Sequence, residues 1–78
     1  MEKKIFEIIC EISDKDLVEK YDMDLFEKGI LDSFAIVQLI SLLEENFNIE
    51  IDPEDIVPEK FSTISEISRL VTDYEEKQ

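Results

Sequence analysis

The sequence contains no histidine and no tryptophan, and it has one glycine, two prolines and one cysteine. Without histidine, the chain cannot by itself form a Ser-His or Cys-His nucleophile pair, an imidazole acid–base group or a histidine metal site. The lone Cys10 cannot form a disulfide within the chain, which fits a reducing compartment. Acidic residues recur at Glu7 and Glu11, so the amino-terminal segment has no long apolar stretch. We therefore expect neither a signal peptide nor a membrane span, and we expect a cytoplasmic location.

Positive charge is also scarce, since 8 Lys and Arg stand against 21 Asp and Glu and give a net charge of −13. Such a chain repels phosphates and anionic lipid, which excludes nucleic acid and direct membrane insertion and favours protein partners with basic faces. With 78 residues, of which 44% are hydrophobic, the chain is long enough for one small core. We therefore expect a single domain over residues 1–78.

Isoleucine spacing predicts the first helix. Ile5, Ile8, Ile9 and Ile12 follow the i, i+3, i+4, i+7 pattern, which predicts an amphipathic helix over residues 2–12, with Cys10 as a small, partly buried hydrophobe beside the stripe. Residues 13–32 are polar and aperiodic and predict a long loop, and long loops in compact domains are often functional. Its expected apolar anchors are Leu17, Val18, Leu25, Phe26, Ile30 and Leu31.

The longest predicted helix covers residues 34–47, which contain neither glycine nor proline. Asp32 and Ser33 precede it, and both are good N-cap residues. On a helical wheel at about 100° per residue, five apolar residues fall in one arc that predicts the core face. They are Ile36, Leu39, Ile40, Leu43 and Phe47.

Proline and capping patterns place the remaining helices. Asp52-Pro53 predicts a short third helix through Ile56, which Pro58 should end, whereas the alternating residues 49–51 are too few for a strand. Residues 63–66 have capping-box spacing and predict a last helix that frays over residues 73–78. Its expected stripe is Ile64, Ile67, Leu70, Val71 and Tyr74. The expected fold class is therefore all-α, a four-helix bundle with a long first loop and a short third helix.

A second face of the longest helix mixes apolar side chains with acidic ones. On the same wheel, Phe34 and Val37 lie among polar and acidic neighbours, which suggests a surface where a partner docks. They could equally cover the underside of the first loop. We call this face and its cap residue the docking surface: Asp32, Ser33, Phe34, Val37, Gln38, Ser41, Glu44 and Glu45.

Ser33 opens this face at the first position of the helix. Its hydroxyl would lie beside the positive end of the helix dipole, where a phosphate ester is electrostatically favoured. A serine at this position more often serves as a plain N-cap. The residues alone leave both interpretations open.

Residues 25–34, followed by 37–40 and 43–47, resemble the Asp-Ser-Leu motif and second helix of acyl and peptidyl carrier proteins, and the resemblance extends over essentially the whole chain. It implies the acyl-carrier type of bundle, a non-catalytic carrier and covalent 4′-phosphopantetheine on Ser33. The group would come from coenzyme A through a separate phosphopantetheinyl transferase that supplies the magnesium site. The chain itself then needs no metal, and Asp22, Asp24 and Glu27 lack EF-hand spacing and are interpreted as solvated carboxylates.

The same resemblance implies a monomer that presents its cargo as a thioester to enzymes that load and unload it. The expected partners are an adenylating ligase or an acyltransferase with a basic docking face. Weak, electrostatically steered encounters suit this role. We expect partners to touch Asp32, Phe34, Val37, Gln38, Ser41, Glu44 and Glu45.

Two positions bear on the cargo. Ala35 and Gln38 stand where fatty-acid carriers typically have Asp and Glu, and the motif region is more similar to D-alanyl carrier proteins. Those proteins often have an Arg and a Trp before the last helix, and this chain has no Trp. The best prediction is a D-alanine carrier. The alternatives are an acyl carrier for fatty-acid or polyketide-type synthesis and an unmodified acidic interaction module.

Overall fold

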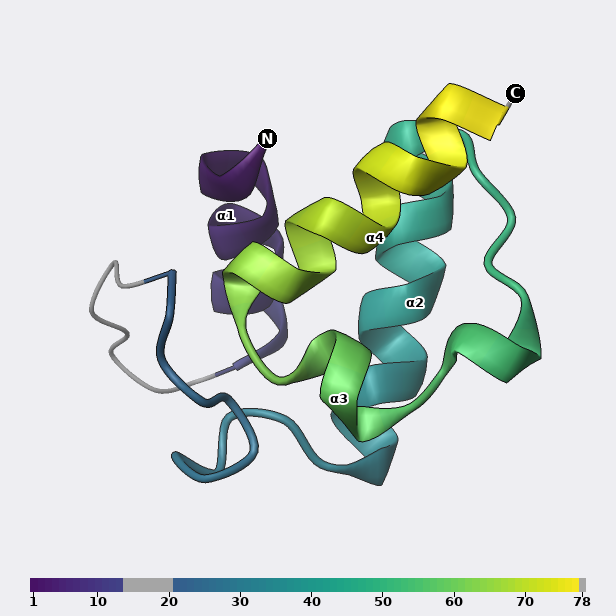
Figure 1. The fold of residues 1–78 in the computed structure, drawn as a ribbon. Coiled ribbons are helices and arrows are strands. Elements are labelled where there is room, and N and C mark those ends of the chain that lie inside the picture. Colours follow the sequence, from purple (N-terminus) through teal and green to yellow (C-terminus); the bar gives the residue numbers. More distant parts are fainter. Residues whose placement is uncertain (14–20, 78) are drawn as a thin grey trace.

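The computed structural model describes residues 1–13 and 21–77, and the regular structure in these ranges is helical throughout (Figure 1). The elements are α1 (Glu2–Ile12), α2 (Ser33–Phe47), the 3-10 turn η1 (Pro53–Asp55), α3 (Pro58–Phe61) and α4 (Ile64–Lys77). The predicted all-α class is confirmed. Within the described ranges, no helix combines the length and the apolar character needed to cross a bilayer.

Helix α1 has the predicted bounds, and its isoleucine stripe faces the core. Ile5, Ile8 and Ile9 are buried and Ile12 is partly buried. The interpretation of Cys10 as a partly buried hydrophobe is wrong, because its side chain is exposed. One step of about 100° beyond Ile9 turns this position out of the buried stripe.

Helix α2 begins at Ser33, one residue earlier than predicted, with Asp32 as its N-cap. The Asp32 carboxylate accepts a hydrogen bond from the Ala35 amide at 2.8 Å, which satisfies one of the free amides of the first turn. The helix ends at Phe47, and its C-cap residue Asn48 has a left-handed backbone (φ 55°) that stops the helix. Asparagine adopts this conformation more readily than most residues.

The core face of α2 is shifted from the predicted arc. Ala35, Leu39 and Leu43 are buried, whereas Ile36 and Ile40 are only partly buried. Ala35 lies two residues after Ser33, in the first turn of the helix. The predicted arc was therefore correct for Leu39 and Leu43, and it missed the buried Ala35.

The prediction for the third helix is corrected at both ends. Residues 53–55 form a single 3-10 turn, with the Asp52 carboxylate accepting from the Glu54 amide at 2.9 Å. Pro58 does not end a helix; it begins α3. Proline suits the first position of a helix because that amide has no intrahelical acceptor. Helix α3 is only four residues long, yet it delivers the fully buried side chain of Phe61.

Helix α4 extends further than predicted. At its start the Thr63 hydroxyl accepts from the Glu66 amide at 3.1 Å, which is one half of the expected capping box. The helix then continues to Lys77, so the expected fraying over residues 73–78 is wrong for residues 73–77. Tyr74 explains part of this extension, since its hydroxyl accepts from the Asp52 amide at 2.8 Å and donates to the Asp55 carboxylate.

The helices enclose one core. Helices α1, α2 and α4 contact one another, and α3 packs against α4 (Figure 1). The Ser65 hydroxyl donates to the Glu2 carboxylate at 3.0 Å and joins α4 to α1. The buried side chains are Ile5, Ile8, Ile9, Leu25, Ile30, Leu31, Ala35, Leu39, Leu43, Ile49, Ile51, Phe61, Ile64, Ile67, Leu70 and Val71.

The first loop is fastened to the α3–α4 junction by its main chain. The Leu25 amide donates to the Ser62 carbonyl at 2.7 Å, and the Ser65 amide donates to the Tyr21 carbonyl at 2.9 Å. The predicted anchors Leu25, Ile30 and Leu31 are buried and Phe26 is partly buried. The other two predicted anchors, Leu17 and Val18, lie outside the described residues.

Asp55 joins the 3-10 turn to two helices. Its carboxylate accepts from the Lys60 ammonium of α3 and from the Tyr74 hydroxyl of α4. The hydrogen bond from Lys60, followed by that from Tyr74, lowers the pKa of Asp55 below its ordinary value. Burial, followed by the bond to Asp55, raises the pKa of Tyr74, so its hydroxyl stays protonated as a donor.

We expect the contribution of Asp55 to stability to disappear in acid. Because its folded pKa lies below its unfolded value of about 4, the contribution is present above that value and is lost as pH falls through the folded pKa. Thermal melts of the wild type and Asp55→Asn should differ at pH 7, and the difference should shrink below about pH 4. Glu54→Gln, at an exposed neighbouring position, should melt like the wild type. A pH-independent difference for Asp55→Asn would contradict the prediction.

Candidate functional site

Ser33 lies exposed at the first residue of α2. The N-cap hydrogen bond of this helix comes from Asp32, whose carboxylate binds the Ala35 amide. Ser33 is therefore not the cap residue, and its hydroxyl is not needed for that role. An exposed hydroxyl at the positive end of a helix is a suitable place for a phosphate ester.

The chain just before Ser33 is tightly folded. The Ile30 and Leu31 amides both donate to the Leu25 carbonyl, at 2.9 and 3.1 Å, and both side chains are buried. Gly29 precedes them with φ 72°, a conformation that glycine adopts without strain. Ser33 thus follows a short segment fixed by buried side chains, so a group attached to it would have a firm base.

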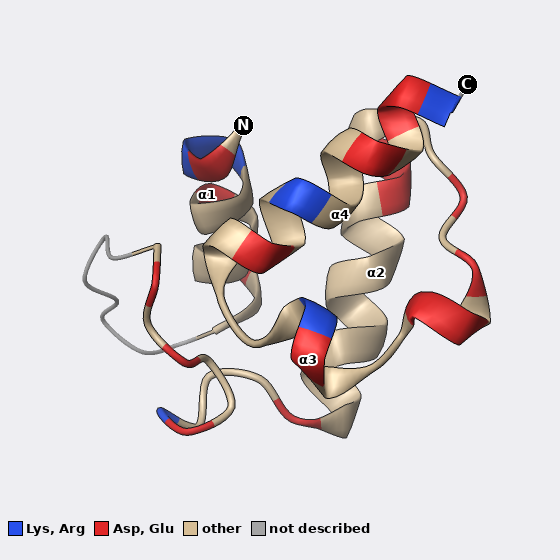
Figure 2. Cartoon of the chain, viewed as in Figure 1, with Lys and Arg blue, Asp and Glu red and all other residues tan. Residues whose placement is uncertain are grey.

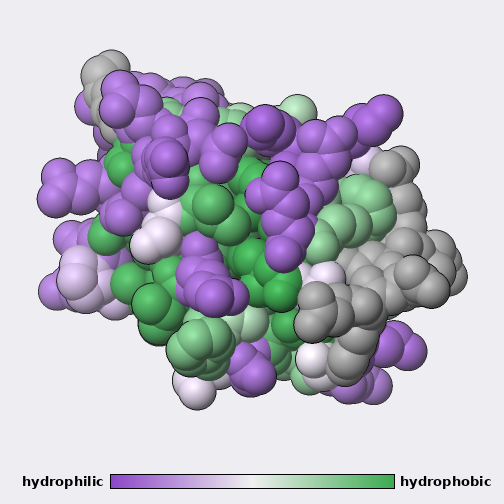
Figure 3. All heavy atoms as spheres, turned by 180° about the vertical axis from the view of Figure 1, so that it is seen from behind, coloured by the Kyte–Doolittle hydropathy of each residue, from purple (hydrophilic) through white to green (hydrophobic). Residues whose placement is uncertain are grey.

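Phe34 and Val37 are strongly exposed, at 73% and 64% of their surface. The interpretation that they cover the underside of the first loop is therefore wrong. Gln38, Ser41 and Glu45 are exposed as well, so most of the docking surface is open. Figure 3, which views the molecule from behind, shows hydrophobic surface in the middle and lower parts of the side facing the viewer and hydrophilic residues along its top.

Glu44 differs from its neighbours because it holds part of the fold. It is half-buried, and its carboxylate accepts from the Ile51 amide at 2.9 Å. Its carbonyl accepts from the Ile49 amide at 3.2 Å. Glu44 therefore ties the segment that follows α2 back to the helix, and its contact with a partner stays a prediction.

The charge on α2 is of one sign. The helix contains no Lys or Arg, and its acidic residues Glu44 and Glu45 lie in its last turns, while Asp32 caps its start (Figure 2). Phe34 and Val37 are therefore exposed apolar side chains on a helix whose charged residues are all acidic. Such a surface complements a basic protein face and steers its approach.

Asp24 of the first loop has a local structural role. The Asp24 carboxylate accepts from the Phe26 and Glu27 amides, both at 3.0 Å, and so caps a turn. Within residues 1–13 and 21–77, no group of three or more Cys, Asp or Glu is arranged to hold a metal ion.

The family model described as a phosphopantetheine attachment site matches residues 3–71, a range that contains Ser33 and all of α2. The chain belongs to the phosphopantetheine-attachment family. Its cofactor is accordingly covalent 4′-phosphopantetheine. Exposed Ser33, which has no capping role, is chemically suited to form the required phosphoester.

Curated relatives of the chain are themselves named as carriers. A D-alanyl carrier protein of Lactococcus lactis subsp. cremoris (strain MG1363) is 43% identical over 72 residues, which cover 91% of both chains. A D-alanyl carrier protein of Bacillus cereus (strain B4264) is 37% identical over 62 residues and 78% of both chains. The resemblance to carrier proteins is therefore confirmed, and so is its closer likeness to D-alanyl carriers.

Sequence reasoning missed two features around the site. Ala35, which the sequence singled out only as a departure from fatty-acid carriers, is a buried residue of the first turn of α2. Ile12 and Leu42 border a groove between α1 and α2, described below. Periodicity within one helix finds that helix's own buried stripe, but a groove depends on how two helices pack.

Proposed function

We propose that Ser33 is the attachment site and that the chain is a stand-alone, non-catalytic carrier of D-alanine. The observation that carries the proposal is the exposed Ser33 hydroxyl at the start of α2, relieved of capping by Asp32. In attachment, the Ser33 oxygen forms a phosphoester as a pyrophosphate P–O bond of coenzyme A breaks, adenosine 3′,5′-bisphosphate leaves and the hydroxyl proton passes to the transferase. The bound group supplies a terminal thiol that holds D-alanine as a thioester.

The D-alanine cargo is supported by the printed names of the relatives and by the share of their length that the chain covers. Ala35 adds a physical argument. Ala35 is 8% exposed, so this chain packs a small apolar side chain at the place where typical fatty-acid carriers have an acidic residue. The start of α2 is thus built for a small apolar residue.

The remaining parts of the proposal concern architecture and partners. We propose that residues 1–78 form one monomeric domain, with α1 to α4 arranged as the acyl-carrier type of four-helix bundle. Mutual packing of α1, α2 and α4, with α3 against α4, supports this arrangement.

The proposed partners are a phosphopantetheinyl transferase and an adenylating ligase with a basic docking face. Since these enzymes use coenzyme A and ATP, we place the protein in the cytoplasm.

Intact-mass measurement tests the proposal in two steps. Incubation with coenzyme A and a broad-specificity transferase should add the mass of one phosphopantetheinyl group. Incubation of the product with D-alanine, ATP and a D-alanine-adenylating ligase should then add one alanyl group that hydroxylamine removes, as expected for a thioester. No first mass gain would favour an unmodified interaction module, whereas loading by a fatty-acyl ligase in preference to the D-alanine ligase would favour the fatty-acid alternative.

Replacing Phe34 with Ala should impair loading without unfolding the protein. With 73% of its surface exposed, Phe34 has little core area to lose, whereas an exposed aromatic side chain is a frequent anchor for partners. We expect kcat/KM for D-alanine loading to fall about tenfold, which corresponds to about 1.4 kcal/mol. Thermal melting should change little. A large drop in the melting temperature with unchanged loading would instead assign Phe34 to the fold.

A further inference from the structure

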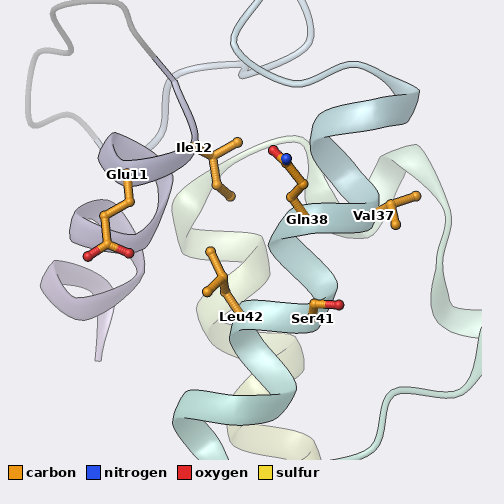
Figure 4. A pocket seen from close by; sticks show the side chains of 6 residues that line it. All are labelled: Glu11, Ile12, Val37, Gln38, Ser41 and Leu42. Carbon is orange, nitrogen blue, oxygen red and sulfur yellow. The ribbon is translucent and has the colours of Figure 1, made fainter.

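Helices α1 and α2 border an open groove of about 530 Å³ (Figure 4). Figure 4 shows Ile12 of α1 and Leu42 of α2 pointing into the space between the two helices, with Gln38 directed towards Ile12. Both apolar side chains are partly buried, so each has one side against the core and another towards the groove. The lining residues are Glu11, Ile12, Val37, Gln38, Ser41 and Leu42.

The groove is continuous with the docking surface. Val37, Gln38 and Ser41 belong to both, and they follow Ser33 by one to two helical turns. At about 1.5 Å per residue, Ser41 lies about 12 Å along the helix from Ser33. A partner that contacts exposed Val37 therefore reaches the groove by extending its contact sideways from α2 to the last turn of α1.

The charge around the groove is negative. Glu11 lines it, exposed Glu7 lies one turn earlier on α1, and α2 has no basic residue. The last turn of α1 also has no basic side chain, so the negative end of its dipole is not offset locally. An apolar floor with the Glu11 carboxylate at its edge fits a partner segment that combines an apolar side chain with a neighbouring Lys or Arg.

We infer that the adenylating ligase binds this groove with such a segment, its apolar side chain between Ile12 and Leu42 and its cation beside Glu11. The inference rests on the proposed function and extends the docking surface onto α1. A transferase must bring its catalytic groups to the Ser33 hydroxyl itself. The ligase acts at the far end of the attached arm, and so it can hold the protein at a distance from Ser33.

Charge reversal on α1 tests the inference. With the phosphopantetheinylated protein as substrate of the D-alanine-adenylating ligase, Glu11→Lys should raise KM at least fivefold and leave kcat nearly unchanged. Glu76→Lys makes the same charge change at an exposed position of α4, outside the groove, and should alter KM less than twofold. The difference between the two variants should narrow at high salt, because exposed charges are screened.

Filling the groove tests its apolar part. Gln38 is exposed, so Gln38→Trp should fold normally while its indole occupies the space beside Ile12. We expect KM to rise at least fivefold, as for Glu11→Lys. Equal KM values for Glu11→Lys, Glu76→Lys and the wild type would overturn the inference, as would normal loading of Gln38→Trp.

The outcomes separate this inference from the proposed function. Failure of the ligase to load the wild-type protein would contradict the proposed function and would also remove the ligase as the occupant. Normal wild-type loading with no specific effect of Glu11→Lys would contradict the groove alone. A wild-type dimer in solution that Glu11→Lys dissociates would identify a second copy of the chain as the occupant and overturn the assignment to the ligase.

Discussion

Ser33→Ala is expected to abolish attachment of phosphopantetheine completely. The replacement removes the only atom through which residue 33 can form the phosphoester, and it leaves the N-cap intact because the capping carboxylate belongs to Asp32. Alanine is also the best helix former, so α2 should lose nothing in local stability. The folded variant should therefore show no mass gain with coenzyme A and the transferase.

Ser41→Ala is the matched control for this experiment. Ser41 is an exposed serine of the same helix, two turns further along. As part of the docking surface it can alter the rate of attachment, but its hydroxyl is not the acceptor, so attachment in the variant should still reach completion. The control should gain the full mass of one phosphopantetheinyl group. A mass gain that survives Ser33→Ala and disappears in Ser41→Ala would transfer the attachment site to the second serine.

Phe61→Ala should cause a large loss of stability, about 3–5 kcal/mol, since Phe61 is fully buried and its truncation leaves a cavity in the core. This is a large part of the total that a domain of this size typically has. Helix α3 contributes no other buried side chain, so the same replacement should also release α3 from α4. Urea unfolding followed by circular dichroism measures the loss.

Phe34→Ala is the control that separates burial from residue type. Both replacements remove the same atoms, but Phe34 is 73% exposed and Phe61 is not exposed at all. The two variants should therefore differ by several kcal/mol in unfolding free energy. Similar unfolding curves for the pair would disprove the assignment of Phe61 to the core. Phe61→Leu, which retains part of the apolar volume, should lose less than Phe61→Ala.

Helices with a clear apolar period and a capping residue were predictable from sequence. Helix α1 follows four isoleucines at helical spacing, and α2 begins beside a capping aspartate. The docking surface emerged from the same wheel, because Phe34 and Val37 fall outside the buried arc. These features depend on interactions a few residues apart, which the sequence states directly.

The features that sequence reasoning missed depend on distant parts of the chain. A proline can end one helix or begin another, so the sequence did not show that Pro58 begins α3. There the burial of Phe61 favours a new helix. The last turns of α4 persist beside Asp52 and Asp55, which Tyr74 meets across about twenty positions of sequence. Glu44 looked like a free surface charge until its bond to the Ile51 amide was seen. Tyr74 and its two aspartates, and Glu44 and the Ile51 amide, are too far apart in sequence for a local pattern to pair them, and the burial of Phe61 depends on the packing of α3 against α4.

The main-chain fastening of the first loop has an evolutionary consequence. Two main-chain hydrogen bonds hold the loop, one from the Leu25 amide to the Ser62 carbonyl and one from the Ser65 amide to the Tyr21 carbonyl. Neither bond involves a side chain. Substitutions at these four positions, proline excepted, leave the donors and acceptors in place. The loop that leads to Ser33 can therefore change its surface residues to suit new enzymes, while the position of the serine that they must find is inherited unchanged.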